Sequence, residues 1–529
     1  MGTPEAPSDE SGDSSMTHPT LSGDVAPGSP RPAWRSVLLV ITCTLAMITN
    51  LASSTSVSVY LPVIGEDLDI PENQLQWLVS AFSLSAGCFL LLLGRLADLY
   101  GRKRFFLIGT LWLAVMSLGC GFCRNATALY ILRGLQGLGP ASFVPACIGT
   151  LAHAFPPSRA RSAAFATFSA GAPMGGAVGT QIGALLTQYT KASWRSPFFL
   201  VTGVACLCAL GGFMFIDPDV PSTEIDKRVD WVGAFLVTGG LVLLVFVLGQ
   251  GSVAPHGWKT GYIIALLIIS VVLLVMFLLW QHYLEKHEGN LPPPLMKLSL
   301  WSRAEGKFAV MQAIAFMQWA AFLSWYFWAQ LYYEDYIKLP PVLTAVRMLP
   351  MTIAGGLCNV FVVLVVSRMD LLVLIVFGTS FTGLGSLLFA IINPSAPYWA
   401  YGFPSTVVSV FGADFIFAAG SLFIAKVSLP HEQSLSGGLF QTLTQLGTSF
   451  GLAITTIVYN SIPGAAQDHA PLRAYKAAQW TAFGMAMLCT LLAAIFLRGV
   501  GPVGSDERRK DQEIAEEKGL PDDSLPSSS

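Results

Sequence analysis

Fourteen long apolar stretches occupy most of this 529-residue chain and constrain its fold more than any other feature. Each is close to the length of about 20 residues that a helix needs to cross a bilayer. Only 12% of the residues are charged, which is roughly half the share in a soluble domain. The sequence therefore predicts an all-α polytopic membrane protein, with spans at 36–60, 75–94, 104–123, 128–152, 162–188, 196–216, 229–250, 260–281, 308–332, 342–366, 371–392, 398–424, 435–459 and 478–498.

The Lys and Arg residues between these stretches set the expected orientation. With the N-terminus in the cytoplasm, membrane-proximal cytoplasmic segments hold roughly twice as many of them as the outer loops. An even number of spans then places both termini in the cytoplasm, with the plasma membrane as the expected location. We expect disordered tails at 1–33 and 501–529, which are polar and have no long apolar run.

The composition also disfavours several classes of function. The net charge of −2 gives no indication of nucleic-acid binding. The single CxxC, at Cys120 and Cys123, lacks the second ligand pair that a metal site needs. No nucleophile elbow or phosphate-binding loop occurs in the sequence. We therefore predict no enzyme activity, no metal and no cofactor, and a monomer surrounded by lipid.

The segment between the second and third spans, GRLADLYGRKRFF at 94–106, has a distinctive spacing of glycines and charges. We call it the latch loop. Gly94 and Gly101 permit a tight turn, and Asp98 lies beside Arg102 and Lys103. A charge network on one side of the membrane can hold one conformation, so we expect these five residues to act as a conformational latch. Topology alone also requires a basic loop here, but not this spacing.

An arginine, Arg133, lies inside the fourth span, in the segment ILRGLQGLGPASFVPA at 131–146. An intramembrane charge is costly and usually faces a cavity or a partner. Gln136 lies three residues later and so roughly on the same face, which makes it a candidate cavity residue. An arginine that snorkels to the membrane surface is the alternative.

The fifth span has a glycine at every fourth position, 171, 175, 179 and 183. Such a stripe, free of side chains, lets another helix approach closely. Pro173 within the stripe favours a kink. A stripe that serves packing alone is the alternative to a role in transport.

Together these motifs resemble the major facilitator superfamily, in its 14-span drug:H⁺ antiporter-2 type. The likeness rests on the latch-loop spacing and on the glycines and proline that follow Arg133. In the fifth span, Gly175 and Gly176 fit the end of the family's antiporter motif, although Ala172-Pro173 replaces its Gly-Pro. RVDWVGAFL at 228–236 is typical of this branch. The segments 71–106 and 411–423 resemble fungal aminotriazole-resistance-type transporters.

The resemblance implies two six-helix bundles, at 34–216 and 308–500, which rock around a central cavity. Two linker spans lie at 217–281, followed by a cytoplasmic loop at 282–307. The antiporter motif, with Gly171, Pro173, Gly175, Gly176 and Gly179, is associated with export. The implied function is therefore proton-coupled efflux of a small organic molecule by alternating access. Transport of a small inorganic or weak-base solute such as borate or ammonium stays open, as does a membrane receptor or scaffold.

The resemblance also implies that an acidic residue within a span carries the coupled proton. Bacterial relatives often place an Asp in the first span, but no acid occurs between 36 and 60. The remaining intramembrane acid is Asp414, nearly half-way along its span. A carboxyl group removed from water takes up a proton more readily than an exposed one. We therefore expect Asp414 to carry the coupled proton, with Arg133 helping to set its release, and a structural hydrogen bond between helices is the alternative.

Aromatic and polar side chains in later spans are candidates for the substrate cavity. Gln318 and Trp325 share one helix face, and Asn359 and Gln441 lie in the tenth and thirteenth spans. Polar groups among aromatic ones suit a loosely selective site for organic molecules. An aromatic face toward lipid or neighbouring helices fits equally well. We expect Glu334, at an outer helix end, to be solvated.

Overall fold

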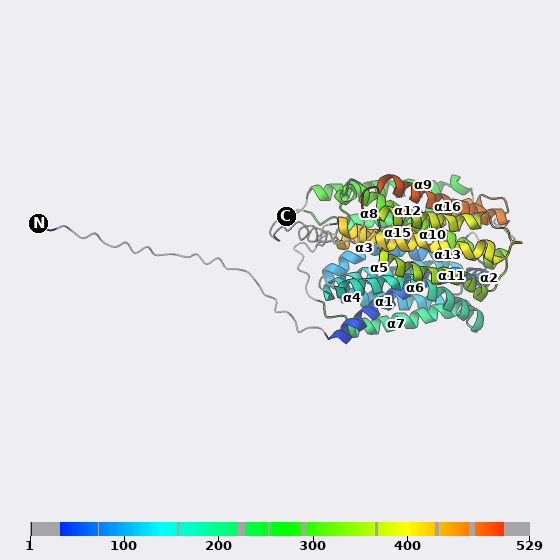
Figure 1. The fold of residues 1–529 in the computed structure, drawn as a ribbon, viewed down its shortest axis with the longest axis horizontal. Coiled ribbons are helices and arrows are strands. Elements are labelled where there is room, and N and C mark those ends of the chain that lie inside the picture. The colour runs from blue at the N-terminus through cyan, green and yellow to red at the C-terminus, as the bar shows by residue number, and fades with distance from the viewer. Residues whose placement is uncertain are drawn as a thin grey trace, which may run out of the picture.

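Every expected span is helical in the computed structural model (Figure 1). The tails expected at 1–33 and 501–529 lie almost wholly outside the residues that it describes. Those residues are 2, 32–71, 74–155, 159–219, 228–251, 254, 256–287, 291–365, 369–428, 433–464 and 471–501.

The N-terminal half supplies six spans, and the first of them changes helix type along its length. A 3₁₀ turn, Ser56–Tyr60 (η1), and a short helix, α2 (Leu61–Leu68), continue the first span. The long helices of this half are α1 (Ala33–Thr55), α3 (Trp77–Tyr100), α4 (Arg102–Gly121), α5 (Ala126–Ala154), α6 (Arg159–Tyr189) and α7 (Ser196–Phe215).

The C-terminal half supplies six more, and two linker helices precede it. The linker helices are α8 (Trp231–Gln250) and α9 (Gly261–Lys286). Two spans of this half contain a turn of π-helix, Tyr332–Tyr336 (η6) after α10 and Ile416–Gly420 (η7) after α13. The helices are α10 (Lys307–Leu331), α11 (Pro341–Val365), α12 (Leu371–Ala390), α13 (Tyr398–Phe415), α14 (Ser421–Val427), α15 (Gln433–Asn460) and α16 (Leu472–Phe496).

The two halves pack their helices in the same pattern. In the first, α1 lies on α6 and α7, α3 on α5, and α4 on α5 and α7. At equivalent positions in the second, α10 lies on α15 and α16, α11 on α13, and α12 on α13 and α16. The halves meet where α3 packs on α15 and α6 on α11. The predicted all-α fold of two six-helix bundles is therefore confirmed.

The two ends of the bundle differ in what they carry. α1 begins and α16 ends at the same end, on the left of Figure 1, which we call the near end. The latch loop lies at this end too, because it joins the end of α3 to the start of α4. The opposite end, where α2 lies, we call the far end.

The glycine stripe of α6 forms a close seam with α1. A Cβ atom on Gly175 would overlap the backbone of Ile48, and one on Gly179 would overlap Ala52. The second half repeats the arrangement, because Gly451 of α15 lies as close to the backbone of α10. Close backbone approach is how helices associate where lipid removes the hydrophobic driving force. The stripe is thus a packing seam in both halves.

In the described part of the chain, eleven helical segments are long and apolar enough to cross a membrane by length and composition. The other three spans, α5, α6 and α15, are long helices that carry more Gly, Ser, Thr or Gln. Two of these form the glycine seams and the third carries Arg133. Their polar groups are therefore tolerated because protein surrounds them rather than lipid.

The linker helices form a hairpin beside the junction of the two halves. α8 packs against both α3 and α15, and α9 packs on α8. Asp230 begins α8 and accepts hydrogen bonds from Gly233 N, Trp280 Nε1 and Gln281 Nε2, at 2.7, 2.8 and 2.7 Å. α9 runs five residues beyond its expected end at 281, into the segment expected to be a loop. Its last turns hold that segment, because Glu285 accepts from the backbone at residues 298 and 299.

Candidate functional site

A cavity lies between the two halves, where α1 and α6 face α10, α11, α13 and α15. Its empty space, which includes open solvent at its mouth, is about 1060 Å³. The helices α1 and α10 are equivalent in the two halves, as are α6 and α15, whereas α11 and α13 line the cavity without their equivalents α3 and α5. Its polar lining is Asn50, Ser54, Thr55, Tyr326, Thr352, Asn359, Asp414, Gln441, Thr444, Gln445 and Thr448.

Asp414 is the single carboxyl, ammonium or guanidinium group among the cavity's lining residues. It lies on α13, two residues before the π-helical turn η7, and is 8% exposed. Its Oδ2 atom has no hydrogen-bond partner. Cys358 and Asn359 of α11 lie beside the carboxyl group as hydrogen-bond partners, and the Asn359 amide also donates to Gly355 O at 2.9 Å. A carboxyl group in the cavity lining with one unpartnered oxygen is a candidate to bind a proton or a cationic ligand.

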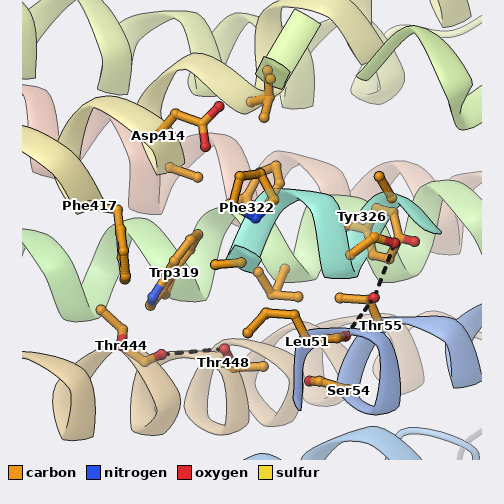
Figure 2. A pocket seen from close by; sticks show the side chains of 18 of the residues that line it. Leu51, Ser54, Thr55, Trp319, Phe322, Tyr326, Asp414, Phe417, Thr444 and Thr448 are labelled. Atoms are coloured by element: carbon orange, nitrogen blue, oxygen red, sulfur yellow. Dashed lines mark hydrogen bonds between the residues drawn. The ribbon is translucent and has the colours of Figure 1, made fainter. Parts of the chain in front are cut away.

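Aromatic rings separate Asp414 from the N-terminal half. Figure 2 shows Trp319, Phe322 and Phe417 between Asp414 on one wall and the α1 residues on the other. The rings of Trp319 and Phe322 lie 5.8 Å apart, and those of Trp319 and Phe417 lie 6.4 Å apart. Ring faces carry partial negative charge and attract cations. The cavity therefore combines one carboxyl group with a wall that suits flat or cationic molecules.

Hydroxyl groups line the other walls of the cavity. Thr55 donates to Leu51 O at 2.9 Å, and Thr448 donates to Thr444 O at 3.3 Å, as the dashed lines in Figure 2 mark. Tyr326 marks the far-end limit of the cavity, where its hydroxyl lies 2.6 Å from that of Thr180. Thr55, Thr444 and Thr448 are bonded to carbonyl oxygens of their own helices, so these hydroxyl groups offer a ligand weak contacts rather than strong ones.

The sequence-predicted cavity residues divide into two groups. Asn359 and Gln441 line the cavity. Gln318 and Trp325 do not, because they point to the opposite side of α10, where Gln318 donates to Thr382 at 2.8 Å and Trp325 to Ser405 at 3.1 Å. Trp325 still supports the cavity wall from behind, with its ring stacked 6.2 Å from that of Phe322.

Arg133 and Gln136 form a polar cluster within the N-terminal half, away from the cavity lining. Arg133 is 0% exposed, and its Nε donates to Leu78 O at 2.7 Å. Its Nη1 donates to Ser53 O at 3.1 Å and to Gln136 Oε1 at 2.7 Å. Gln136 in turn donates to Ser117 at 2.6 Å. Arg133 thus ties α5 to α1 and α3, and it does not snorkel to the surface.

The structure does not place Arg133 beside Asp414. The Arg133 guanidinium lies over the Phe82 ring at 4.7 Å, and its described hydrogen bonds stay within the first half. Its one link toward the cavity is Ser53, next to the lining residue Ser54 on α1. Any influence of Arg133 on Asp414 would therefore pass through α1 rather than by contact.

The expectation that Glu334 is solvated is wrong. Glu334 is 6% exposed, and neither of its carboxylate oxygens has a hydrogen-bond partner. It lies in the π-helical turn η6, which rotates the end of α10 relative to a regular helix. The sequence gives no sign of that turn, and a charged residue at a helix end is usually exposed.

The latch loop is held by contacts within the N-terminal half. Arg102 bonds to Asp98 at 2.9 Å and to Gly149 O of α5 at 3.1 Å. Lys103 Nζ donates to the last turn of α7, at Ile216 O, at 2.6 Å. Gly101 has φ of 119°, and a Cβ there would overlap Asp219. In this conformation the loop therefore stabilises the packing of the N-terminal half, and its role as a latch stays a prediction.

Asp219, which the sequence reasoning missed, is the acidic partner of this loop. Its carboxylate accepts hydrogen bonds from Lys103 N at 2.8 Å and Arg104 N at 3.1 Å. It thereby satisfies free backbone groups at the start of α4, where a negative charge is favourable. An acid just beyond the sixth span, opposite a basic loop, was the available signal.

Hydrogen bonds between the halves gather on one side of the cavity. Four join described residues of the two halves: Thr180 to Tyr326, Gln181 Nε2 to Ala345 O, Val342 N to Gln188 Oε1, and Ser449 to Ser80 O. By the direction of their helices, all four lie between the cavity and the far end. Among the residues that the structure describes, these four hydrogen bonds therefore join the halves on the far side of the cavity.

Comparison with known proteins assigns the chain to a family. Residues 43–233 match the family model described as Major Facilitator Superfamily. The low affinity ammonium transporter of Saccharomyces cerevisiae is 30% identical over 476 residues, which cover 88% of each chain. The protein belongs to the major facilitator superfamily. It is thus a multi-pass membrane transporter by family.

Other members of the superfamily place the chain among fungal resistance and efflux transporters. The aminotriazole resistance protein of Saccharomyces cerevisiae is 26% identical, over 88% of this chain and 84% of that one. The efflux pump terJ of Aspergillus terreus is also 26% identical, over 90% and 88%. These relatives are consistent with the fungal drug:H⁺ antiporter type, and so the predicted resemblance is confirmed.

Solved structures show the same fold at low identity. The POT family transporter PepTSo superposes with a TM-score of 0.67 at 16% identity, over 89% of this chain and 98% of that chain. The human organic anion transporter MFSD10 superposes with a TM-score of 0.57 at 15% identity, over 88% and 100%. These likenesses concern the major facilitator fold alone.

Proposed function

We propose that this transporter exports a small organic molecule in exchange for protons, by alternating access to the cavity between its halves. The observation that carries the proposal is Asp414, a buried carboxyl group with a free oxygen in a cavity that both halves line. A charged carboxylate that is buried with one oxygen lacking a donor is unfavourable in such a site. Asp414 therefore alternates between binding a proton and interacting with substrate.

The cycle follows from competition for this one group. When the cavity faces the substrate side, substrate displaces the proton from Asp414. When it faces the opposite side, a proton binds and substrate leaves. One ligand lowers the affinity of the site for the other, and this reciprocity is the physical basis of coupled exchange. Arg133 takes part as a positioning residue, by fixing the part of α1 that carries Ser53 and Ser54.

We also propose the orientation of the chain. The near end, with the latch loop and the start of α1, faces the cytoplasm, because this end carries the excess of Lys and Arg. The far end then faces outward, in the plasma membrane. The four hydrogen bonds between the halves then lie on the outer side of the cavity, and from them we infer an outside-closed conformation. Substrate accordingly enters the cavity from the cytoplasm.

A second candidate is transport of a weak base. The relative that is 30% identical is named a low affinity ammonium transporter, and Asp414 among Trp319 and Phe417 would attract a small cation. The cavity is larger than an ammonium ion needs, which favours the organic substrate.

The test uses the full chain in membrane vesicles with an imposed pH gradient. Vesicles are offered a flat organic cation, a neutral aromatic compound or methylammonium as the probe. The proposal predicts gradient-driven movement of at least one organic probe, abolished by a protonophore. Movement of methylammonium alone would favour the second candidate. Transport of an organic probe that ignores the pH gradient would overturn proton coupling.

A further inference from the structure

Glu334 is a second buried carboxyl group, and the cycle proposed above does not use it. It lies outside the cavity lining, in the π-helical turn η6 at the far end of α10. It is 6% exposed, and both of its carboxylate oxygens lack a hydrogen-bond partner. Turns of π-helix are rare and occur often at functional sites. Asp414 also lies beside such a turn, η7.

The neighbouring charged groups are engaged elsewhere. Asp335, the charged group that acts on Glu334, accepts from Lys338 Nζ at 3.0 Å. It also accepts from Tyr475 OH on α16 at 2.7 Å. A second acid beside Glu334 makes a charged Glu334 still less favourable.

The other elements around this turn bring no partner either. On α11, which packs against η6, Arg347 lies over the Tyr333 ring at 5.0 Å and over the Tyr398 ring at 5.4 Å. On η1, which packs against α10 and α11, the Tyr60 hydroxyl lies 3.3 Å from that of Ser56. Among the described residues, none therefore donates a hydrogen bond to Glu334.

Glu334 lies on the part of α10 that closes the far end. Tyr326, Gln330 and Glu334 follow one another at four-residue intervals. Tyr326 lines the cavity and contacts Thr180 of the other half. The three side chains therefore mark a polar line from the cavity toward the far end, beside the contacts that hold the halves together.

We propose that Glu334 is a proton-binding site whose protonation, from the solution at the far end, accompanies closure of that end. The inference rests on the proton-coupled transport proposed above. When the far end is closed, a carboxylate at Glu334 would be buried without a donor, so the closed conformation favours the neutral acid. When the halves separate there, water reaches the group and stabilises its charge. Each closure thus transfers one proton from bulk water to the carboxylate oxygen.

This step makes closure of the far end depend on the external pH, because the proton is taken from, and returned to, the solution on that side. With the far end outward, an acidic exterior favours protonated Glu334 and hence the outside-closed conformation. The transporter closes toward the outside after releasing its substrate, with a proton on board. A ligand can shift such an equilibrium only by its differential affinity for the two conformations, and here the proton is that ligand.

The test follows opening of the far end through a cysteine at a buried contact. Ala345 is 1% exposed, and its carbonyl accepts from Gln181 of the other half. The full chain with Ala345→Cys is treated in intact cells with a membrane-impermeant maleimide, at a series of external pH values. Labelling of the chain without this substitution is subtracted. We expect labelling to slow as the exterior is acidified, by up to about tenfold per pH unit if one proton is taken up per closure.

Three variants in the Ala345→Cys background decide the role of Glu334. Glu334→Gln keeps the shape but not the charge, so its labelling should be slow at every pH. Glu334→Asp should keep a pH dependence. The matched control is Asp335→Asn, one residue away, which should keep the slope of the unmodified chain. A Glu334→Gln chain with that same slope would overturn the proposal.

Protein that fails to reach the membrane is recognised by surface biotinylation, and Glu334→Leu then repeats the test with a second neutral side chain. The labelling needs no substrate, so its outcome is separate from that of the export assay. Loss of the slope in Glu334→Gln, in a chain that exports no probe, would support this inference and contradict the proposed function. An unchanged slope in a chain that does export would contradict this inference alone.

Discussion

The helices α5 and α13 occupy equivalent positions in the two halves, yet their buried charged residues have opposite surroundings. Arg133 on α5 donates three hydrogen bonds, to Leu78 O, Ser53 O and Gln136, and only its Nη2 atom lacks a partner. Asp414 on α13 leaves its Oδ2 atom without a partner, in the lining of a cavity. The fold thus holds one buried charge with three fixed hydrogen bonds inside its own half and places the other in the wall of the cavity.

Because of this difference, we expect substitutions at the two residues to affect different properties, the stability of the fold in one case and the transport cycle in the other. A buried group that donates several hydrogen bonds is costly to remove, because its partners are left unpaired. A buried carboxyl group with a free oxygen already lacks that stabilisation, so its amide analogue fits at least as well. Changes on α5 should therefore act on the folded state, whereas changes on α13 should act on the coupled cycle. The following predictions probe this comparison.

The largest effect, on the amount of folded protein, is expected at the glycine seams, which occur at equivalent positions in the two halves. Gly175→Leu forces α6 away from Ile48 of α1, and Gly451→Leu forces α15 away from Ala320 of α10. Each variant should lose nearly all folded protein from the membrane, measured by size-exclusion chromatography after mild detergent extraction.

The control for these seams is Gly203→Leu on α7, because nothing lies within 4 Å of a Cβ atom at Gly203. It should yield protein at the level of the unmodified chain. Normal yield from Gly175→Leu together with loss from Gly451→Leu would show that the seam between α6 and α1 matters less for folding than the seam between α15 and α10.

The next effect is expected at Arg133. Arg133→Gln removes donors from Leu78 O and Ser53 O, and we expect a loss of about 3 kcal/mol of stability, since hydrogen bonds to charged groups contribute about 1.5–3 kcal/mol each. Thermal unfolding in detergent measures the change. The exposed Arg124, changed to Gln, is the control. Arg133→Gln protein that is as stable as the control would contradict a structural role.

The smallest effect is expected behind the cavity wall. Trp325→Phe keeps the ring against Phe322 but removes the hydrogen bond to Ser405, which is 3.1 Å long. One such bond contributes about 1 kcal/mol, so substrate affinity should fall about fivefold through a looser wall. The KM for an exported probe measures this change. A loss of maximal rate with unchanged KM would place Trp325 in the cycle rather than beside the substrate.

The sequence was enough to predict the spans and the family, because the length of an apolar run and the spacing of the latch loop are local properties. Asp414 could also be singled out, as an acid in the middle of a span. What a single sequence leaves open is which helix faces which. Gln318 and Trp319 are neighbours in the chain, yet one points into its own half and the other into the cavity.

Two features of the site cannot be predicted from the residues next to them in the sequence. The π-helical turns η6 and η7 shift the faces of α10 and α13, and without them the burial of Glu334 is not foreseeable. The contribution of α1 to the cavity, through Asn50, Ser54 and Thr55, depends on the glycine seam that fixes its rotation. Both arise from packing between distant parts of the chain.

The proposal that Asp414 carries the coupled proton is tested most directly by measuring gradient-driven export by Asp414→Asn in vesicles that contain the full chain. The control is Asp69→Asn, at an exposed position with φ of 52°, where Asn is readily accommodated. We expect Asp414→Asn to be as stable as the control and still to exchange labelled for unlabelled probe across the membrane. Its pH-gradient-driven export should fall to the level of empty vesicles. Undiminished export of the probe against a pH gradient would contradict the proposal that Asp414 carries the coupled proton.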